Sequence, residues 1–195
     1  MHTPSRIAPV AEPLSPELAT RMARLIPAGM PPPQLFLTVA RNAELFAHLV
    51  DTGLIGPTGL MDRQTLRRPL RECIILRTCV AARNDYEFNL HAQTISLRMG
   101  ITAAQIDDVR AGDPDPRLWP VEFIGVMRLV DGLVRNLEVS DSTFDEVREH
   151  FDDATLIEIT QLVGLYVGVA MQVALSQPRL DRYRPGPPTL ARFEV

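Results

Sequence analysis

Three side chains between residues 72 and 91 have the residue types of a proton relay: Glu72, Glu87 and His91. Histidine titrates near neutral pH, so its ring can accept and donate a proton within one reaction cycle. A neighbouring carboxylate orients the imidazole and stabilises its charged form. The simpler interpretation is that Glu87 and His91 form a pair four residues apart on a helix surface, while Glu72 is a hydrogen-bonded core residue.

Two consecutive helices joined by a tight turn are predicted to carry these residues. Pro69 suits the first turn of a helix that runs to about Ala82, and Arg83-Asn84 breaks that helix. The second helix is expected to run to Met99 and to stop at Gly100. In an antiparallel pair, the first glutamate and the histidine are offset by roughly 6 Å along the helix axes. The two side chains can bridge this offset directly or through a water molecule.

The role of Glu87 is open at this point. Asn84 followed three residues later by a glutamate is a capping-box pattern, in which the glutamate serves the start of the helix. Glu87 therefore has three interpretations: a catalytic group, a group that holds His91 in place, or chiefly the partner of the Asn84 cap.

The rest of the chain predicts an all-α scaffold for this hairpin. Apolar residues recur at helical spacing, and no convincing strand is found. About seven to nine helices are expected, and residues 34–50 form one kinked helix or two, depending on whether Asn42 caps a second piece. A single domain over residues 1–195 is predicted. It has a Pro-rich N-terminal arm at about 1–13 and a C-terminal strap at about 178–195.

Charge and hydropathy limit the partners. The net charge is −4 and the pI about 5.6, which argues against nucleic acid or an anionic membrane as a partner and disfavours a helical DNA-binding module. No uninterrupted apolar run approaches the roughly 20 residues of a membrane span, and no signal-like segment follows the N-terminus. A cytoplasmic location is the expectation.

Two residue counts exclude further chemistry. All 20 basic residues are arginine, which excludes Schiff-base catalysis, a pyridoxal-phosphate anchor and a P-loop. The two cysteines, Cys73 and Cys79, lie six residues apart on one predicted helix, where they cannot form a disulfide. Their spacing indicates neither a metal site nor a redox pair.

The pattern Glu72, Asn84, Glu87 and His91 resembles the core of the carboxymuconolactone decarboxylase family, which is related to the AhpD-like alkylhydroperoxidases. The peroxidase branch has cysteines at the two middle positions, so this chain is similar to the cysteine-free, decarboxylase-like branch. The supporting runs are Arg71 to Arg77, Tyr86-Glu87-Phe88 with His91, Arg98 to Thr102, and Leu162-Val163-Gly164 with Tyr166.

The resemblance implies an AhpD-like helical bundle that assembles as a homo-oligomer, commonly a trimer or hexamer. It implies a cofactor-free lyase of the decarboxylase type, not a thiol peroxidase. Its substrate would be a small carboxylated lactone, or a related oxoacid or secondary metabolite. His91 would be the general acid/base and Glu72 its relay partner. Candidate substrate contacts are Arg77, Arg83, Arg98 and Tyr86. The alternative is a non-catalytic, oligomeric ligand-binding or scaffold protein of the same fold.

Overall fold

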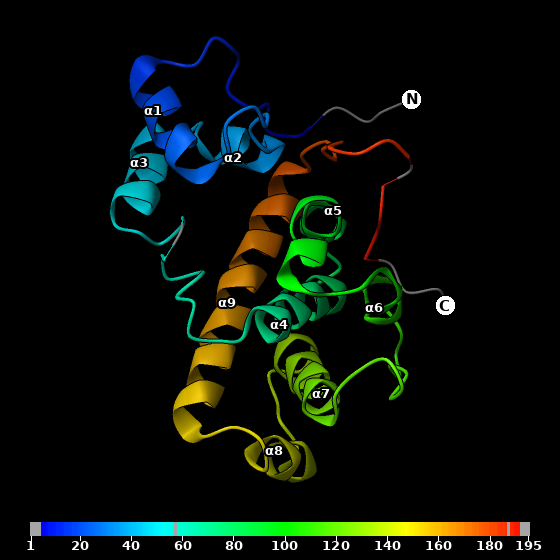
Figure 1. Ribbon diagram of the computed structural model, residues 1–195. Coiled ribbons are helices and arrows are strands. Elements are labelled where there is room, and N and C mark those ends of the chain that lie inside the picture. Colours follow the sequence, from blue (N-terminus) through cyan, green and yellow to red (C-terminus); the bar gives the residue numbers. More distant parts are fainter. Residues whose placement is uncertain (1–4, 57, 187, 192–195) are drawn as a thin grey trace. The chain divides into compact units, whose positions relative to one another are not determined.

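The computed structural model describes residues 5–56, 58–186 and 188–191, and every regular element in this part of the chain is helical (Figure 1). The prediction of an all-α fold with seven to nine helices is therefore confirmed. The α-helices are α1 (Pro16–Leu25), α2 (Gln34–Val39), α3 (Ala43–Asp51), α4 (Arg68–Ala81), α5 (Asp85–Thr94), α6 (Ala103–Asp108), α7 (Val121–Arg135), α8 (Asp141–Arg148) and α9 (Asp153–Ser176).

The chain divides into two compact units. The first consists of Met1–Thr65 and Val173–Asp181, and the second of Leu66–Gln172 and Arg182–Val195. In the first unit, α1, α2 and α3 enclose a small apolar core that contains Met22, Leu37 and Phe46. The Oδ1 atom of Asn42 accepts the backbone N–H of Leu45 at 3.0 Å and so caps α3. Residues 34–50 are therefore two helices.

Helix α4 is the buried element of the second unit. It packs against α5 and α7, and α7 packs in turn against α8 (Figure 1). Every residue from Glu72 to Val80 is buried, including one glutamate and one arginine. Buried charges are costly unless they are paired. The partners of the buried glutamate and arginine therefore show whether each residue is structural or part of a functional site.

Helix α5 is shorter than predicted. It ends at Thr94, and a separate 3₁₀ turn, η1 (Ser96–Met99), follows it. The prediction of one continuous helix to Met99 is therefore wrong over its last turn. Two β-branched residues at the junction, Thr94 and Ile95, weaken the helix there, and the backbone of Ile95 leaves α-helical geometry with φ −118°. Gly100 ends the turn at φ 92°, as a left-handed C-terminal residue requires.

The described part of the C-terminal segment runs along one face of α5. The backbone N–H groups of Tyr183 and Arg184 donate to Gln93 Oε1, at 2.8 and 3.2 Å. Farther along, Thr189 donates to Asn89 and Ala191 to Asp85. The three acceptor residues are spaced by four along the helix and so share one face. Neutral amides and one carboxylate thus hold an extended chain against α5.

Helix α9 has 24 residues and a mean hydropathy of 1.6 in its most apolar window, so by length and composition it could cross a membrane. It is the one such helix in the described part of the chain. Ile159, Val163 and Tyr166 of α9 are buried within the protein. A core helix of a soluble protein passes the same test, so this feature indicates a membrane span only weakly.

Candidate active site

Glu72 and His91 meet inside the second unit. Imidazole Nδ1 lies 2.9 Å from Glu72 Oε1, and the two side chains are 3% and 0% exposed. The antiparallel hairpin predicted from the spacing thus brings these residues into direct contact. A buried carboxylate beside an imidazole favours the imidazolium form, in which Nδ1–H donates to the carboxylate.

Glu87 completes a carboxylate–imidazole–carboxylate arrangement. Its Oε1 lies 3.4 Å from His91 Nε2, on the opposite side of the ring from Glu72. Asn84 Oδ1 accepts the Glu87 backbone N–H at 3.2 Å, which is the expected N-cap. The Asn84 backbone N–H, however, donates to the Cys79 carbonyl at 2.7 Å. Of the three interpretations of Glu87, the geometry therefore favours a carboxylate directed at His91 over a capping-box partner.

The two oxygens of Glu72 have different surroundings. Oε1 accepts from both His91 and the Ser96 hydroxyl, the latter at 2.7 Å. Oε2 is buried and has no hydrogen-bond partner among the described residues. A buried acceptor without a donor costs about 1–3 kcal/mol, so it is unusual in a purely structural glutamate.

The electrostatics of the pair favour its charged form. Burial alone would lower the pKa of His91, but attraction and hydrogen bonds from Glu72 and Glu87 outweigh it and raise that pKa to about 10. Burial alone would raise the pKa of Glu72, yet His91, the Ser96 hydroxyl and the charge of Arg71 hold it below its ordinary value. At neutral pH the site therefore holds an imidazolium beside an ionised Glu72.

Tyr166 of α9 forms another wall of the site. Its ring lies edge-on to the His91 imidazole, with 5.7 Å between ring centroids and an interplanar angle of 79°. Burial, together with the charges of Glu87 and Glu72, raises the pKa of the phenol well above its ordinary value, against the opposite effect of Arg71. Tyr166 therefore stays protonated, and its ring packs against the imidazole of His91.

One predicted substrate contact is contradicted. Arg77 is 1% exposed, and each of its three guanidinium nitrogens donates to a protein acceptor. Nε and Nη2 donate to the carboxylate of Asp131 at 2.9 and 2.5 Å, and Nη1 donates to the carbonyls of Val109 and Ala111. With these donors committed to the protein, Arg77 cannot hold a substrate carboxylate. It is a structural residue that ties α4 to α7 and to the end of α6.

The other predicted contacts lie at the edges of the hairpin. Arg83 is exposed at the end of α4, and Arg98 is exposed in η1, where its guanidinium donates to the Thr94 carbonyl. Tyr86 is buried in the first turn of α5. The arginine whose charge acts on Glu72 is instead Arg71, which was not among the predicted contacts.

The cysteines are inert in this environment. Cys73 and Cys79 are both buried and free, and burial raises the pKa of each thiol. A thiol with a raised pKa supplies little thiolate, which is the reactive form in peroxide reduction. No group of three or more histidine, cysteine, aspartate or glutamate side chains within the described ranges is arranged to hold a metal ion.

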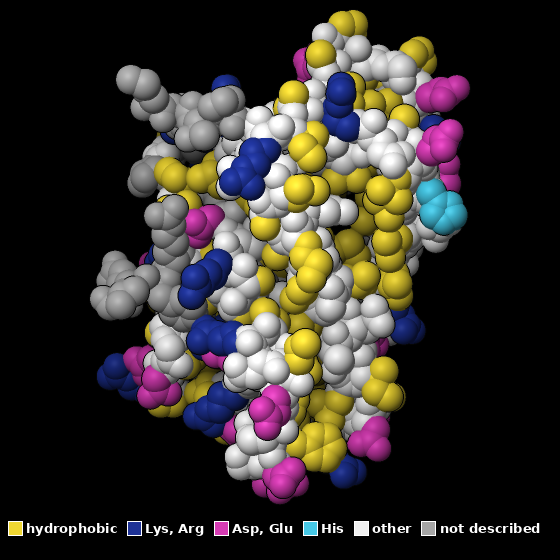
Figure 2. All heavy atoms as spheres, turned by 180° about the vertical axis from the view of Figure 1, so that it is seen from behind, with side chains coloured by type: hydrophobic (Ala, Val, Ile, Leu, Met, Phe, Trp, Pro, Cys, Tyr) yellow, Lys and Arg dark blue, Asp and Glu magenta, His cyan; other side chains and the backbone are white. Residues whose placement is uncertain are grey.

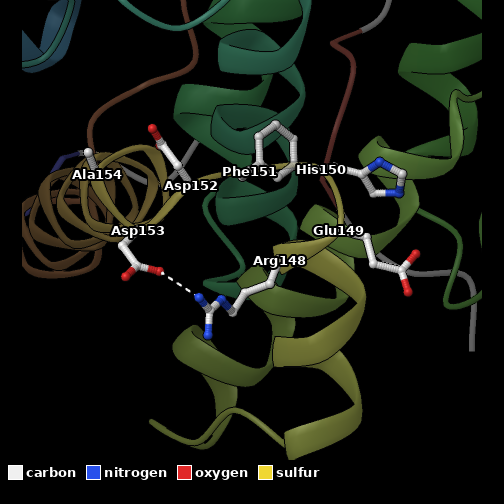
Figure 3. Close-up of a pocket in the computed structure, with 7 residues that line it drawn as sticks. All are labelled: Arg148, Glu149, His150, Phe151, Asp152, Asp153 and Ala154. Carbon is white, nitrogen blue, oxygen red and sulfur yellow. Dashed lines mark ion pairs between the residues drawn. The ribbon is translucent and has the colours of Figure 1, made fainter.

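A hollow of about 610 Å³ lies at the turn between α8 and α9, far along the chain from the hairpin. Figure 3 shows that its side chains do not converge: His150 and Glu149 lie on one side, and Asp152 and Asp153 on the other. The ion pair drawn there joins Arg148 to Asp153 at 3.5 Å, between exposed side chains. The hollow is an open surface feature without the geometry of a reaction site.

Sequence reasoning missed Ser96 and Tyr166 as site residues. Ser96 lies five residues after His91 and would be carried away from it on a continuous helix. Only the break at Ile95 turns it back toward α4. Tyr166 lies far along the chain. Its sequence signals are a polar aromatic residue within an apolar helix and its place in one of the runs that carry the family resemblance.

The fold and the site define an all-helical protein with a buried imidazole held between two carboxylates. Residues 57–131, which include Glu72, Glu87 and His91, match the family model of the carboxymuconolactone decarboxylase family. This match supports the family relationship that the pattern Glu72, Asn84, Glu87 and His91 predicts. No curated protein and no solved structure matches the chain.

Proposed function

We propose that the protein is a cofactor-free lyase of the decarboxylase type that acts on a small carboxylated lactone, or on a related oxoacid or secondary metabolite. The observation that supports this most is the buried contact of 2.9 Å between Glu72 Oε1 and His91 Nδ1, with Glu87 3.4 Å from Nε2. The family match over residues 57–131 supports the same reaction class.

The proposed step is loss of carbon dioxide followed by protonation of carbon. The bond between the ring carbon and the carboxylate breaks, and its electron pair moves into the conjugated lactone carbonyl as a dienolate. His91 Nε2–H then gives its proton to the carbon, and a proton from solvent restores the imidazolium. Glu72 stabilises the imidazolium from the other nitrogen throughout. The balance is one carboxylate and one proton consumed, with one carbon–hydrogen bond and one carbon dioxide formed.

Glu87 has a distinct place in this proposal. Its side chain is 11% exposed, the highest fraction among the three site residues, while Glu72 is fully buried. Glu87 therefore lies on the side of the imidazole that is nearer to solvent. In this role it accepts a proton from solvent and passes it to Nε2 after each turnover, and it holds the ring in place between turnovers.

Substrate contacts are assigned to Arg83, Arg98 and Tyr86, in keeping with their positions on the two helices of the hairpin and the turn that follows. A homo-oligomer and a cytoplasmic location are part of the same proposal. Exposed apolar side chains on α9, such as Ile157 at 71% and Met171 at 67%, support a contact between subunits. Figure 2, which shows the molecule from behind, has apolar side chains on the face that it presents.

The test is single-turnover loss of ultraviolet absorbance with 4-carboxymuconolactone. The wild type is expected to consume the lactone, and His91→Ala to lose about 10²–10⁴-fold in rate. Full rate in His91→Ala would refute the relay. An inactive wild type would refute this substrate and point to another one. Binding of the lactone without its consumption would favour the alternative, a ligand-binding or scaffold protein.

A further inference from the structure

The hydroxyl of Ser96 has an unusual partner. Buried threonine hydroxyls nearby donate to the carbonyl four residues back in their own helix, as Thr78 does to Ile74 and Thr94 to Leu90, each at 2.7 Å. Such bonds are the ordinary way for a helix to satisfy a buried hydroxyl. Ser96 instead donates at 2.7 Å to the carboxylate of Glu72, 24 positions away on another helix.

Backbone geometry holds Ser96 in this position. The break after α5 places it in η1, and its carbonyl accepts the Ile101 N–H at 3.1 Å. Gly100 closes the turn in a left-handed conformation, and a Cβ built on it would lie 3.2 Å from the Pro69 ring. The turn is thus fitted closely against the start of α4. Ser96 itself is 0% exposed, so no water competes for its hydroxyl.

We propose that Ser96 is a positioning residue of the Glu72–His91 pair, which turns Glu72 Oε1 toward the imidazole. With donors from α5 and from η1 on one oxygen, the carboxylate is fixed in rotation about its last bond. Because both donors bind Oε1, this orientation leaves Oε2 without a donor among the described residues. Ser96 acts on the reaction only through Glu72.

Several other groups act on the same carboxylate, so a test must separate the serine from them. His91 and Arg71 both favour the ionised form of Glu72. Glu72 acts in turn on three further titratable groups, namely Tyr166 of α9 and the two thiols of Cys73 and Cys79. None of these groups changes when only the Ser96 hydroxyl is removed.

The experiment is a carbon-13 NMR titration of the Glu72 carboxyl carbon in the full chain, assigned with Glu72→Gln. Ser96→Ala is expected to raise the pKa of Glu72 by about one pH unit, because a hydrogen bond to a charged group is lost. Ser96→Cys, which keeps the shape but donates weakly, is expected to shift it in the same direction. Ser96→Thr keeps a hydroxyl and is expected to restore the wild-type titration.

Thr78→Val is the matched control, since it removes a fully buried hydroxyl of α4 that does not touch Glu72. It is expected to leave the Glu72 titration unchanged. Identical titrations in the wild type, Ser96→Ala and Ser96→Cys would overturn the proposal. The titration requires no substrate, so its failure is distinct from a failure of the lactone assay. Ser96→Ala should also shift the acid limb of the pH–rate profile to higher pH, and this second expectation rests on the proposed function.

Discussion

Helix α4 buries two charges five residues apart, and their surroundings differ. Arg77 uses its donors on one carboxylate and two backbone carbonyls. Glu72 has two donors on one oxygen and, among the residues that the structure describes, none on the other. Buried polar groups with their partners in place make a fold rigid, whereas a buried group with an unsatisfied atom calls for a reason such as a catalytic role. The comparison separates a structural ion pair from a candidate reaction centre on the same helix.

The largest expected effect is at the structural pair. Arg77→Leu is expected to lower the free energy of unfolding by about 3–5 kcal/mol, because it leaves two carbonyls without their donor and Asp131 with only its longer pair to Arg135, at 3.6 Å. Chemical denaturation measures this. Arg128→Leu removes an arginine whose side chain is 54% exposed from its pair with Glu146 and is the control, with an expected cost of about 0.2–1 kcal/mol. Equal losses of stability in the two variants would mean that the buried pair of Arg77 contributes no more than an exposed ion pair.

The second effect is a pH dependence that belongs to the Glu72–His91 pair. Because folding raises the pKa of His91 from 6.5 to about 10, its contribution to stability is complete below about pH 6.5. That contribution is lost as the pH rises toward 10. The free energy of unfolding of the wild type should therefore fall between about pH 7 and pH 9.

Glu72→Gln should make this dependence shallower, since the glutamine carries no charge to hold the imidazolium. The cysteines and Tyr166 also have raised pKa values and add a fall of the same sign at higher pH, so the difference between wild type and variant is the quantity to measure. Parallel curves would mean that the pair does not couple to folding.

A third effect concerns the face of α5 that holds the C-terminal segment. Asn89 is fully buried, and its Oδ1 accepts from both Thr189 N–H and Gln93 Nε2. Asn89→Ala is expected to cost about 1–3 kcal/mol in stability while leaving the pKa of His91 unchanged. Thermal unfolding and a histidine titration together would show it. A change in the pKa of His91 in this variant would mean that the two faces of α5 are coupled.

The smallest effect is expected at the thiols. Cys73→Ala and Cys79→Ala should leave the rate of lactone consumption per folded molecule unchanged, because both thiols are buried and their raised pKa keeps them protonated. Single-turnover assays of each variant test this. Loss of turnover in a well-folded Cys79→Ala protein would place a thiol in the reaction.

The sequence carries the parts of this architecture that depend on local signals. Proline at a first turn and the asparagine caps predict where helices begin, and the structure confirms them. Helical spacing and the tight turn predict that Glu72 and His91 approach each other. The contact observed at 2.9 Å agrees.

What the sequence could not supply depends on long-range packing. Arg77 had the same local signal as a surface arginine, and only its burial against Asp131, 54 positions away, reveals a structural role. Ser96 required the end of α5 at Thr94, which no glycine or proline marks. Tyr166 approaches His91 only because α9 returns to the hairpin. In each case the tertiary structure, rather than local propensity, sets the role of the residue.

An NMR titration of the His91 ring from about pH 6 to about pH 11 tests most directly whether Glu72 and Glu87 hold it as an imidazolium. If two carboxylates hold the imidazole, its nitrogen resonances should remain those of an imidazolium through neutral pH and change with a midpoint near 10. Glu72→Gln should bring that midpoint down. A wild-type midpoint near the ordinary value of 6.5 would contradict the account, because His91 would then be an unperturbed histidine and not one member of a charged pair.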